Sequence, residues 1–216
     1  MVIKVLNLYS GIGGNRQLWQ NVEVTAVEYD KQIANIYKTL YPNDTIIIGD
    51  AHQFLLDNYE YFDFIWASPP CPTHSNLIRF QQGLQYKRKY PDMKLYQEII
   101  FLMNFCKTKW VVENVISYYN PLIKPFECDN HYFWADFHIS KYDKVSRDIV
   151  SDDLAAKEKA RGISLQPFAM SNRRKITLLN NMVMPNIGLH IFKCAFKDIQ
   201  ITLLNDGNKL NKAKAV

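Results

Sequence analysis

The sequence lacks several features that would assign it to broad classes of protein. No uninterrupted apolar run approaches the roughly eighteen residues that a membrane-spanning helix needs. The first nine residues are a short strand-like run that contains Lys4, unlike a signal peptide. No internal repeat or low-complexity segment is present. These absences predict a cytoplasmic protein without a membrane partner.

Paired cysteines are missing as well. The chain has four cysteines, Cys71, Cys106, Cys128 and Cys194, and no two of them have the C-x-x-C spacing that is typical of a zinc site. Their wide separation does not indicate a disulfide framework either. We therefore expect free thiols in a reducing compartment and no bound metal.

The length and charge of the chain set only loose limits. Its 216 residues suit one domain, and 48% of them are hydrophobic, which argues against disorder. The net charge of +5 suits a polyanionic partner but is common in proteins that bind none. Two basic clusters are candidates for contacts with phosphates: Lys87, Arg88 and Lys89, and Arg173, Arg174 and Lys175. Solvated surface loops would have the same composition.

Short apolar runs alternate with helical patterns in the first part of the chain. We expect strands at residues 2–8, 22–27, 45–48, 62–67 and 109–112. Helices are expected at residues 31–40 and 93–105, and residues 15–20 can open another. This alternation predicts an α/β fold with a doubly wound, mostly parallel sheet, which binds ligands at the carboxyl ends of its strands.

Glycines and acidic residues follow the first three strands. The first loop contains Gly11, Gly13 and Gly14, which let the backbone turn tightly and approach a ligand. Glu28 ends the second strand, where a carboxylate can accept hydrogen bonds from both ribose hydroxyls of a nucleoside. Asp50 ends the third and can accept one from an adenine amine. The residues that could flank the adenine are Tyr29, Ala51 and Leu95. Ordinary turns and strand caps would explain each feature alone, but together they predict one adenosyl ligand.

A thiol and a carboxylate follow the fourth and fifth strands. Cys71 lies within the run Pro69-Pro70-Cys71-Pro72, where each proline restricts the backbone and holds the thiol rigidly. Glu113 ends the fifth strand, next to the fourth in the simplest doubly wound order, so it can share a cleft with Cys71. The plain alternatives are a buried core cysteine and a carboxylate paired with a lysine. A cysteine between prolines at a strand end suits a core poorly.

Taken in order, these motifs resemble those of the cytosine C5 DNA methyltransferases. The segment LNLYSGIGG at residues 6–14 is similar to the first motif of the family, Glu28-Tyr29-Asp30 to the second and Gly49-Asp50 to the third. Pro69-Pro70-Cys71 resembles the nucleophile motif, and Glu113-Asn114-Val115 the glutamate motif. Residues 180–183 resemble the last motif, a helix start that folds back beside the cofactor. Several motifs in the family's order argue against chance.

The resemblance implies a Rossmann-like methyltransferase fold and a DNA cytosine-5 methyltransferase that bonds transiently to the base through Cys71. It implies S-adenosylmethionine as cofactor, with S-adenosylhomocysteine as product, and a cytosine flipped out of double-stranded DNA. The catalytic residues would be Cys71 and Glu113, with His131 and Arg173 as further candidates. The cofactor residues would be Tyr9, Ser10, Gly11, Gly13, Gly14, Glu28, Tyr29, Asp50, Ala51, Pro69, Leu95 and Asn181.

Three positions depart from the family pattern. Asn7 stands where the family usually has aspartate, and Pro72 where it usually has glutamine. The arginine-bearing motif that follows the glutamate has two candidates, residues 130–134 with His131 and residues 171–175 with Arg173. The position of residues 130–134 in the order of the motifs and their strand-like character favour His131.

The separate recognition domain of the family has no counterpart, since only about forty-five residues separate Trp134 from residue 180. We expect a catalytic core at residues 1–120, a reduced recognition or insert region at 121–179 and a returning C-terminal segment at 180–216. The chain resembles the compact phage-type members, which carry segments similar to residues 133–134 and 188–192. We expect a monomer from a phage, a mobile element or a restriction-modification system.

Other functions remain open at this point. A tRNA cytosine-5 methyltransferase shares the same motifs and chemistry. A non-catalytic subunit that binds cofactor or DNA beside a partner is a second alternative, against which the intact Cys71 and Glu113 argue. An amino-group methyltransferase would have an aromatic residue after Ser68-Pro69-Pro70, where this chain has Cys71.

Overall fold

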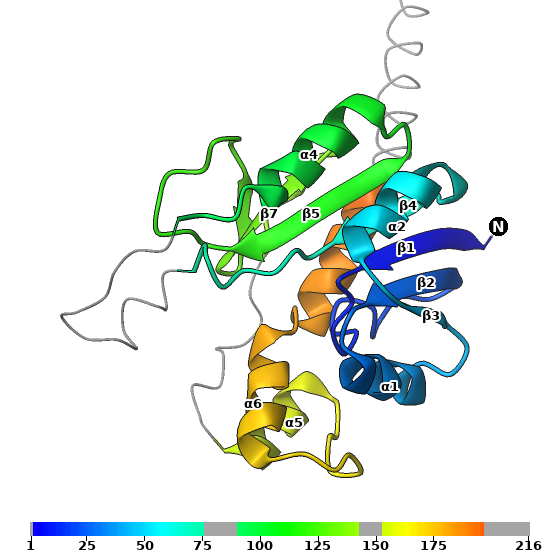
Figure 1. Ribbon diagram of the computed structural model, residues 1–216, viewed down its shortest axis with the longest axis vertical. Coiled ribbons are helices and arrows are strands. Elements are labelled where there is room, and N and C mark those ends of the chain that lie inside the picture. The colour runs from blue at the N-terminus through cyan, green and yellow to red at the C-terminus, as the bar shows by residue number, and fades with distance from the viewer. Residues whose placement is uncertain (1, 76–89, 143–152, 197–216) are drawn as a thin grey trace, which may run out of the picture.

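A seven-stranded sheet forms the centre of the computed structural model, which describes residues 2–75, 90–142 and 153–196 (Figure 1). The strand order is β3-β2-β1-β4-β5-β7-β6. The strands are β1 (Ile3–Leu8), β2 (Val22–Glu28), β3 (Thr45–Ile48), β4 (Phe64–Ala67), β5 (Lys109–Val115), β6 (Phe126–Cys128) and β7 (His131–Ala135). The helices are α1 (Lys31–Leu40), α2 (Ala51–Asn58), the 3-10 turn η1 (Tyr59–Tyr61), α4 (Lys94–Phe105), α5 (Leu154–Arg161), α6 (Asn172–Asn181) and residues 185–196.

The strands β1 to β5 run parallel, whereas β7 is antiparallel to β5, and β6 to β7. In the register, Leu8 at the end of β1 lies between Val27 of β2 and Ala67 of β4. The carboxyl ends of these strands therefore meet at one edge. This arrangement confirms the predicted doubly wound, mostly parallel α/β sheet and is the fold in which ligands bind at that edge.

Both faces of the sheet are buried. Because side chains alternate along a strand, Val5 and Leu6 of β1 face opposite sides. Leu6 and Ile65 pack against α2 and α4, whereas Val5 and Phe64 pack against the helix of residues 185–196. Figure 1 shows α4 and this last helix, in orange, on opposite sides of β5. The sheet is therefore the middle layer of three.

A smaller apolar cluster joins α5 and α6 to the edge of this core. Ile36 of α1 packs there with Leu154, Leu165, Leu179 and Met182. The pair of helices lies beside α1 in Figure 1, away from α4. The segment that contains α5 and α6 is thus attached next to the loops after β1 and β2.

The helices after β2 and β3 begin at acidic caps. Asp30 accepts hydrogen bonds from the backbone N–H groups of Gln32 and Ile33, and Asp50 accepts one from Gln53. Such caps satisfy N–H groups that have no partner within the helix. No helix in the described ranges is long and apolar enough to cross a membrane.

The structure corrects the prediction of a helix at residues 15–20. Residues 14–18 form turns instead. The side chain of Asn15 is buried and donates to the Asn7 side-chain oxygen at 2.8 Å, while Gly14 packs against the backbone of Val183. These long-range contacts override the local helical pattern. β5 also continues two residues past Glu113, to Val115, which places Glu113 inside the strand rather than at its end.

The region expected as an insert, residues 121–179, contributes to the central sheet. Its strands β6 and β7 extend the sheet beyond β5, with Val115 opposite His131. Since this pairing is antiparallel, β7 brings its first residue to the carboxyl end of β5. The proposed boundary at residue 120 therefore runs through one sheet.

Candidate active site

A cavity of about 670 Å³ lies at the carboxyl ends of the parallel strands. This volume is in the range of pockets that hold small-molecule ligands. All the residues predicted for the cofactor except Gly13 line it: Tyr9, Ser10, Gly11, Gly14, Glu28, Tyr29, Asp50, Ala51, Pro69, Leu95 and Asn181. Cys71, Glu113 and His131 line the same cavity. The loops after β1 to β5 thus bring the two predicted groups of residues together.

The three glycines after β1 have different structural roles. Gly11 has φ +54°, a left-handed conformation that favours glycine, and a side chain there would meet nothing within 4 Å. A side chain at Gly13 would overlap the rings of Tyr37 and Tyr41, and one at Gly14 would overlap Met182 and Val183. Gly11 is therefore needed for the turn at the cavity, Gly13 combines a left-handed φ of +79° with close packing, and Gly14 allows close packing at the cavity wall.

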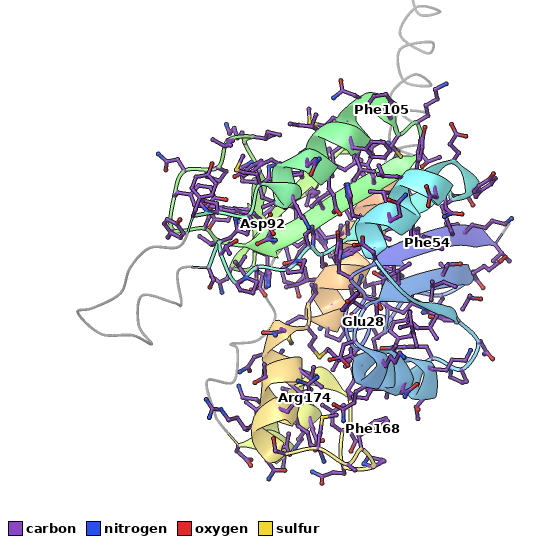
Figure 2. The ribbon with its side chains drawn as sticks, viewed as in Figure 1. Glu28, Phe54, Asp92, Phe105, Phe168 and Arg174 are labelled. Atoms are coloured by element: carbon purple, nitrogen blue, oxygen red, sulfur yellow. The ribbon has the colours of Figure 1, made fainter. Side chains whose placement is uncertain are left out.

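Glu28 is held at the end of β2 by two backbone groups. One carboxylate oxygen accepts a hydrogen bond from the Gly11 N–H at 3.0 Å, and the other from the Asp30 N–H at 2.9 Å. Each oxygen has a second lone pair. Figure 2 labels Glu28 between the sheet and the segment that carries α6. The carboxylate is thus fixed at the cavity, and each of its oxygens can still accept a further hydrogen bond from a ligand.

A second observation also fits a ligand in this part of the cavity. The hydroxyl of Ser10 is buried, lines the cavity and has no hydrogen-bond partner among the described residues. Buried polar groups are rarely left unpaired. Together with Glu28 and the capping carboxylate of Asp50, Ser10 offers hydrogen bonds to a ligand that has both hydroxyl and amine groups. The residues present therefore fit S-adenosylmethionine.

Hydrogen bonds hold the loop that carries Cys71. The Asn114 side chain donates to the carbonyl of Pro69 at 3.0 Å, and the backbone N–H groups of His74 and Ser75 donate to the carbonyl of Cys71. The thiol is half-buried. Burial, and then the nearby Glu113 carboxylate, raise the pKa of Cys71. The loop that carries the free thiol is thus held in place, and the surroundings of the thiol disfavour its thiolate form.

Glu113 and His131 approach each other from β5 and β7. The imidazole Nε2 of His131 lies 3.7 Å from a carboxylate oxygen of Glu113. Glu113 is only 7% exposed, and His131 is partly buried. The antiparallel pairing of β7 with β5 produces this contact. Of the two candidates for the arginine-bearing motif, His131 is the one that lies in the cavity with Cys71 and Glu113.

The predicted basic residues of α6 are not part of the cavity wall. Arg173 is exposed, and Arg174, labelled in Figure 2, donates to Asp30 at 2.7 Å. Lys175 is 5% exposed, so its side chain is packed inside and not on the surface where a phosphate contact was expected. Residues 87–89 lie outside the described residues.

Four residues of the site escaped the sequence analysis. Asn114 orients the Cys71 loop, His74 lies in the cavity wall, and His52 and Glu98 form a hydrogen-bonded pair behind Tyr9. Glu98 had one sequence signal, because it lies three residues after Leu95 on the apolar side of a predicted helix. Within the described ranges, no group of three or more His, Cys, Asp or Glu side chains could hold a metal ion.

Comparison with known proteins identifies the family. A model of the C-5 cytosine-specific DNA methylase family matches residues 3–121. The structure of the Entamoeba histolytica methyltransferase EhMeth superposes with a TM-score of 0.63 and 12% sequence identity, covering 92% of this chain and 99% of that one. This similarity concerns the fold. A search of the curated proteins found no match.

Two other solved structures match about half of this chain. Spodoptera frugiperda DNMT2 has 25% identity and a TM-score of 0.37, over 52% of this chain and 35% of that one. A putative DNA modification methyltransferase encoded within a prophage (E. coli) has 21% identity and a TM-score of 0.36, over 55% of this chain and 33% of that one. This chain thus spans about a third of their length. The family model covers more than half of the present chain, which therefore belongs to the C-5 cytosine-specific DNA methylase family.

Proposed function

We propose that the protein transfers a methyl group from S-adenosylmethionine to carbon 5 of cytosine in double-stranded DNA. One observation carries the proposal: Cys71 and Glu113 line the same cavity as Glu28, Asp50 and the glycine loop. A base that enters beside Cys71 would therefore meet a methyl donor held by Glu28. The family of the chain and its fold support this assignment.

Cys71 begins the proposed reaction as a nucleophile. Its thiolate adds to carbon 6 of a cytosine that has been flipped out of the duplex, and a sulfur–carbon bond forms. Glu113 stabilises a proton on the ring nitrogen, so that the electron pair released by the addition becomes available at carbon 5. S-adenosylmethionine, held by Glu28 and Asp50, would supply an electrophilic methyl group to that carbon and become the neutral thioether S-adenosylhomocysteine. Loss of the carbon 5 proton to water then re-forms the carbon 5–carbon 6 double bond, breaks the sulfur–carbon bond and releases Cys71 as a thiolate, while the proton on the ring nitrogen returns to Glu113.

The electrostatics of the pair fit this order of events. In the free protein, burial and the Glu113 charge raise the pKa of Cys71 and disfavour the thiolate. When Glu113 shares a proton with the base, the repulsion decreases and the thiolate becomes easier to form. His131, 3.7 Å from Glu113, is proposed to orient that carboxylate.

Exposed arginines on α6 are proposed to contact the DNA backbone. Arg173 and Arg174 are exposed, and Arg174 donates to Asp30, the residue after Tyr29 of the cavity wall. Phosphate contacts of this kind make binding depend strongly on salt concentration. We propose that the enzyme acts on DNA inside the cell that produces it.

Methyl transfer with purified protein tests the function. The protein is incubated with S-adenosylmethionine labelled in the methyl group and with double-stranded DNA or tRNA as acceptor. We expect label in the DNA, and bisulfite sequencing should locate it at carbon 5 of cytosine. Label in tRNA alone would mean that the substrate is RNA and not DNA. A protein that neither binds S-adenosylmethionine nor labels either acceptor would contradict the proposal.

A further inference from the structure

A buried carboxylate lies directly behind the wall of the cavity. Glu98 of α4 is only 1% exposed, three residues after Leu95, which lines the cavity. Burial raises the pKa of Glu98, since desolvation disfavours the charged form. One of its oxygens has no hydrogen-bond partner among the described residues. Burying a carboxylate costs free energy unless hydrogen bonds compensate for the lost water, so the hydrogen bonds of Glu98 are expected to have a function.

The other oxygen of Glu98 binds two side chains of the cavity wall. It accepts a hydrogen bond from the hydroxyl of Tyr9 and lies within hydrogen-bond distance, 3.2 Å, of Nδ1 of His52. Tyr9 follows β1, and His52 lies in the first turn of α2, two residues after Asp50. Glu98 therefore ties together the loops after the first and third strands, and both of its partners line the cavity.

Each partner needs this support. Tyr9 has φ +54°, a left-handed conformation that a residue with a side chain adopts at a cost. Its hydrogen bond to Glu98 fixes the ring in the position that this backbone gives it. The contact of Nδ1 of His52 with the same oxygen orients the imidazole beside Asp50, because one of the two atoms must donate to the other.

We infer that Glu98 is a positioning residue that sets the affinity for the adenosyl group by orienting Tyr9 and His52. This inference rests on the proposed function, because it assigns this part of the cavity to S-adenosylmethionine. Glu98 does not line the cavity and so acts through its partners. Its partners Tyr9 and His52 lie close to Ser10 and Asp50 in the chain, and it therefore controls binding of the cofactor and not the chemistry at the base.

Calorimetric titration of S-adenosylmethionine and of S-adenosylhomocysteine tests the inference. Glu98→Gln replaces the carboxylate by an amide, in which one of the two terminal atoms is a donor instead of an acceptor. Binding of both ligands should weaken roughly tenfold, which is the scale of one hydrogen bond to a charged group. The KM for S-adenosylmethionine should rise by a similar factor while kcat at saturating cofactor stays unchanged. Glu127→Gln, an exposed site on β6, is the matched control and should bind as the wild type does.

Tyr9→Phe, which removes only the phenol hydroxyl, shows whether Glu98 acts through its partners. The double variant should lose less affinity than the two single losses combined, because both changes remove the same hydrogen bond. If Glu98→Gln does not fold, the Tyr9→Phe titration decides alone, and unchanged affinity overturns the inference. A fall in kcat as large as the rise in KM, or fully additive losses, also overturns it. A wild-type protein that does not bind S-adenosylmethionine contradicts the proposed function itself.

Discussion

The N-terminal region, residues 3–121, and the C-terminal region, residues 122–196, contribute differently to the cavity. The first supplies five parallel strands, with Glu28 at the end of β2, Glu113 inside β5 near its carboxyl end and Cys71 in the loop after β4. Among its described residues, the second supplies two antiparallel strands and three helices, and it adds His131 and residues 178 and 180–183 to the cavity wall. The thiol and carboxylate proposed to react therefore come from the first region, whereas the second completes the cavity wall around them.

The two regions nevertheless form one packed body. The indole N–H of Trp19 donates to the carbonyl of Gly188 at 3.1 Å, and side chains at Gly14 or Gly188 would overlap the opposite backbone. Trp19 also stacks on Phe192 with ring centroids 5.2 Å apart. The C-terminal region is therefore a structural part of the same fold and not a separate module beside it.

The largest expected effect is that of Cys71→Ser, which removes the nucleophile of the N-terminal region. Turnover should fall on the order of 10³-fold or more, the scale seen when a covalent nucleophile is lost. Binding of S-adenosylmethionine should persist, because the thiol is proposed to react with the base. Transfer of labelled methyl groups and calorimetry measure the two quantities. Cys106→Ser is the control, and turnover near the wild-type level in Cys71→Ser would refute the covalent role.

Gly14→Ala tests how closely the two regions pack. A methyl group at this position would overlap the carbonyl of Val183 and lie 2.9 Å from Cβ of Met182. We expect a loss of about 2 to 3 kcal/mol in the free energy of unfolding, within the range for an overpacked site. Gly11→Ala is the matched comparison, because its added methyl group would meet no atom within 4 Å. Alanine would still have to adopt φ +54°, which should lower the free energy of unfolding by about 1 kcal/mol. Urea unfolding gives both values, and equal losses would argue against a tight contact.

Glu113→Gln tests whether the thiol and the carboxylate interact. Burial, followed by the charge of Glu113, raises the pKa of Cys71, so removing the charge should lower that pKa toward the usual value of about 8.5. The thiolate is the form that reacts, and alkylation of Cys71 by iodoacetamide should therefore become fast at lower pH. Mass spectrometry of the peptide that contains Cys71 measures the alkylation of this cysteine separately from the other three. The profile of Glu127→Gln should match the wild type, and an unmoved profile in Glu113→Gln would contradict the shared site.

The five strands and the helices α1 and α4 of the N-terminal region could be predicted because their signals are local, whereas α2 was not expected. The helix at residues 31–40 was predicted with its observed bounds, since Asp30 caps it and its apolar residues have helical spacing. The parallel sheet followed from the alternation of strands and helices. The turns at residues 14–18 could not be predicted, because Asn15 bonds to Asn7 and Gly14 packs against Val183, both contacts that a local pattern does not reveal.

The candidate site was predictable where a residue follows a strand. Glu28 and Asp50 lie at strand ends and Cys71 lies in the loop after β4, as expected, although their roles stay predictions. Glu98 was missed because a carboxylate within a helical pattern normally indicates a solvated face, and only the fold reveals that it is buried behind Tyr9. The contact of His131 with Glu113 likewise depends on an antiparallel pairing that the sequence does not specify.

The smallest expected effect is that of Arg174→Ala in the C-terminal region. The ion pair of Arg174 with Asp30 has side chains that are 45% and 38% exposed, and such pairs contribute less than about 1 kcal/mol to stability. Urea unfolding should therefore change little. If the same arginine also contacts a phosphate, the slope of log affinity for DNA against log salt should decrease by about one. Arg173→Ala, at the exposed neighbouring position, is the control for stability. A loss of several kcal/mol in Arg174→Ala would mean that this surface pair, and not the buried contact at Gly14, joins the two regions.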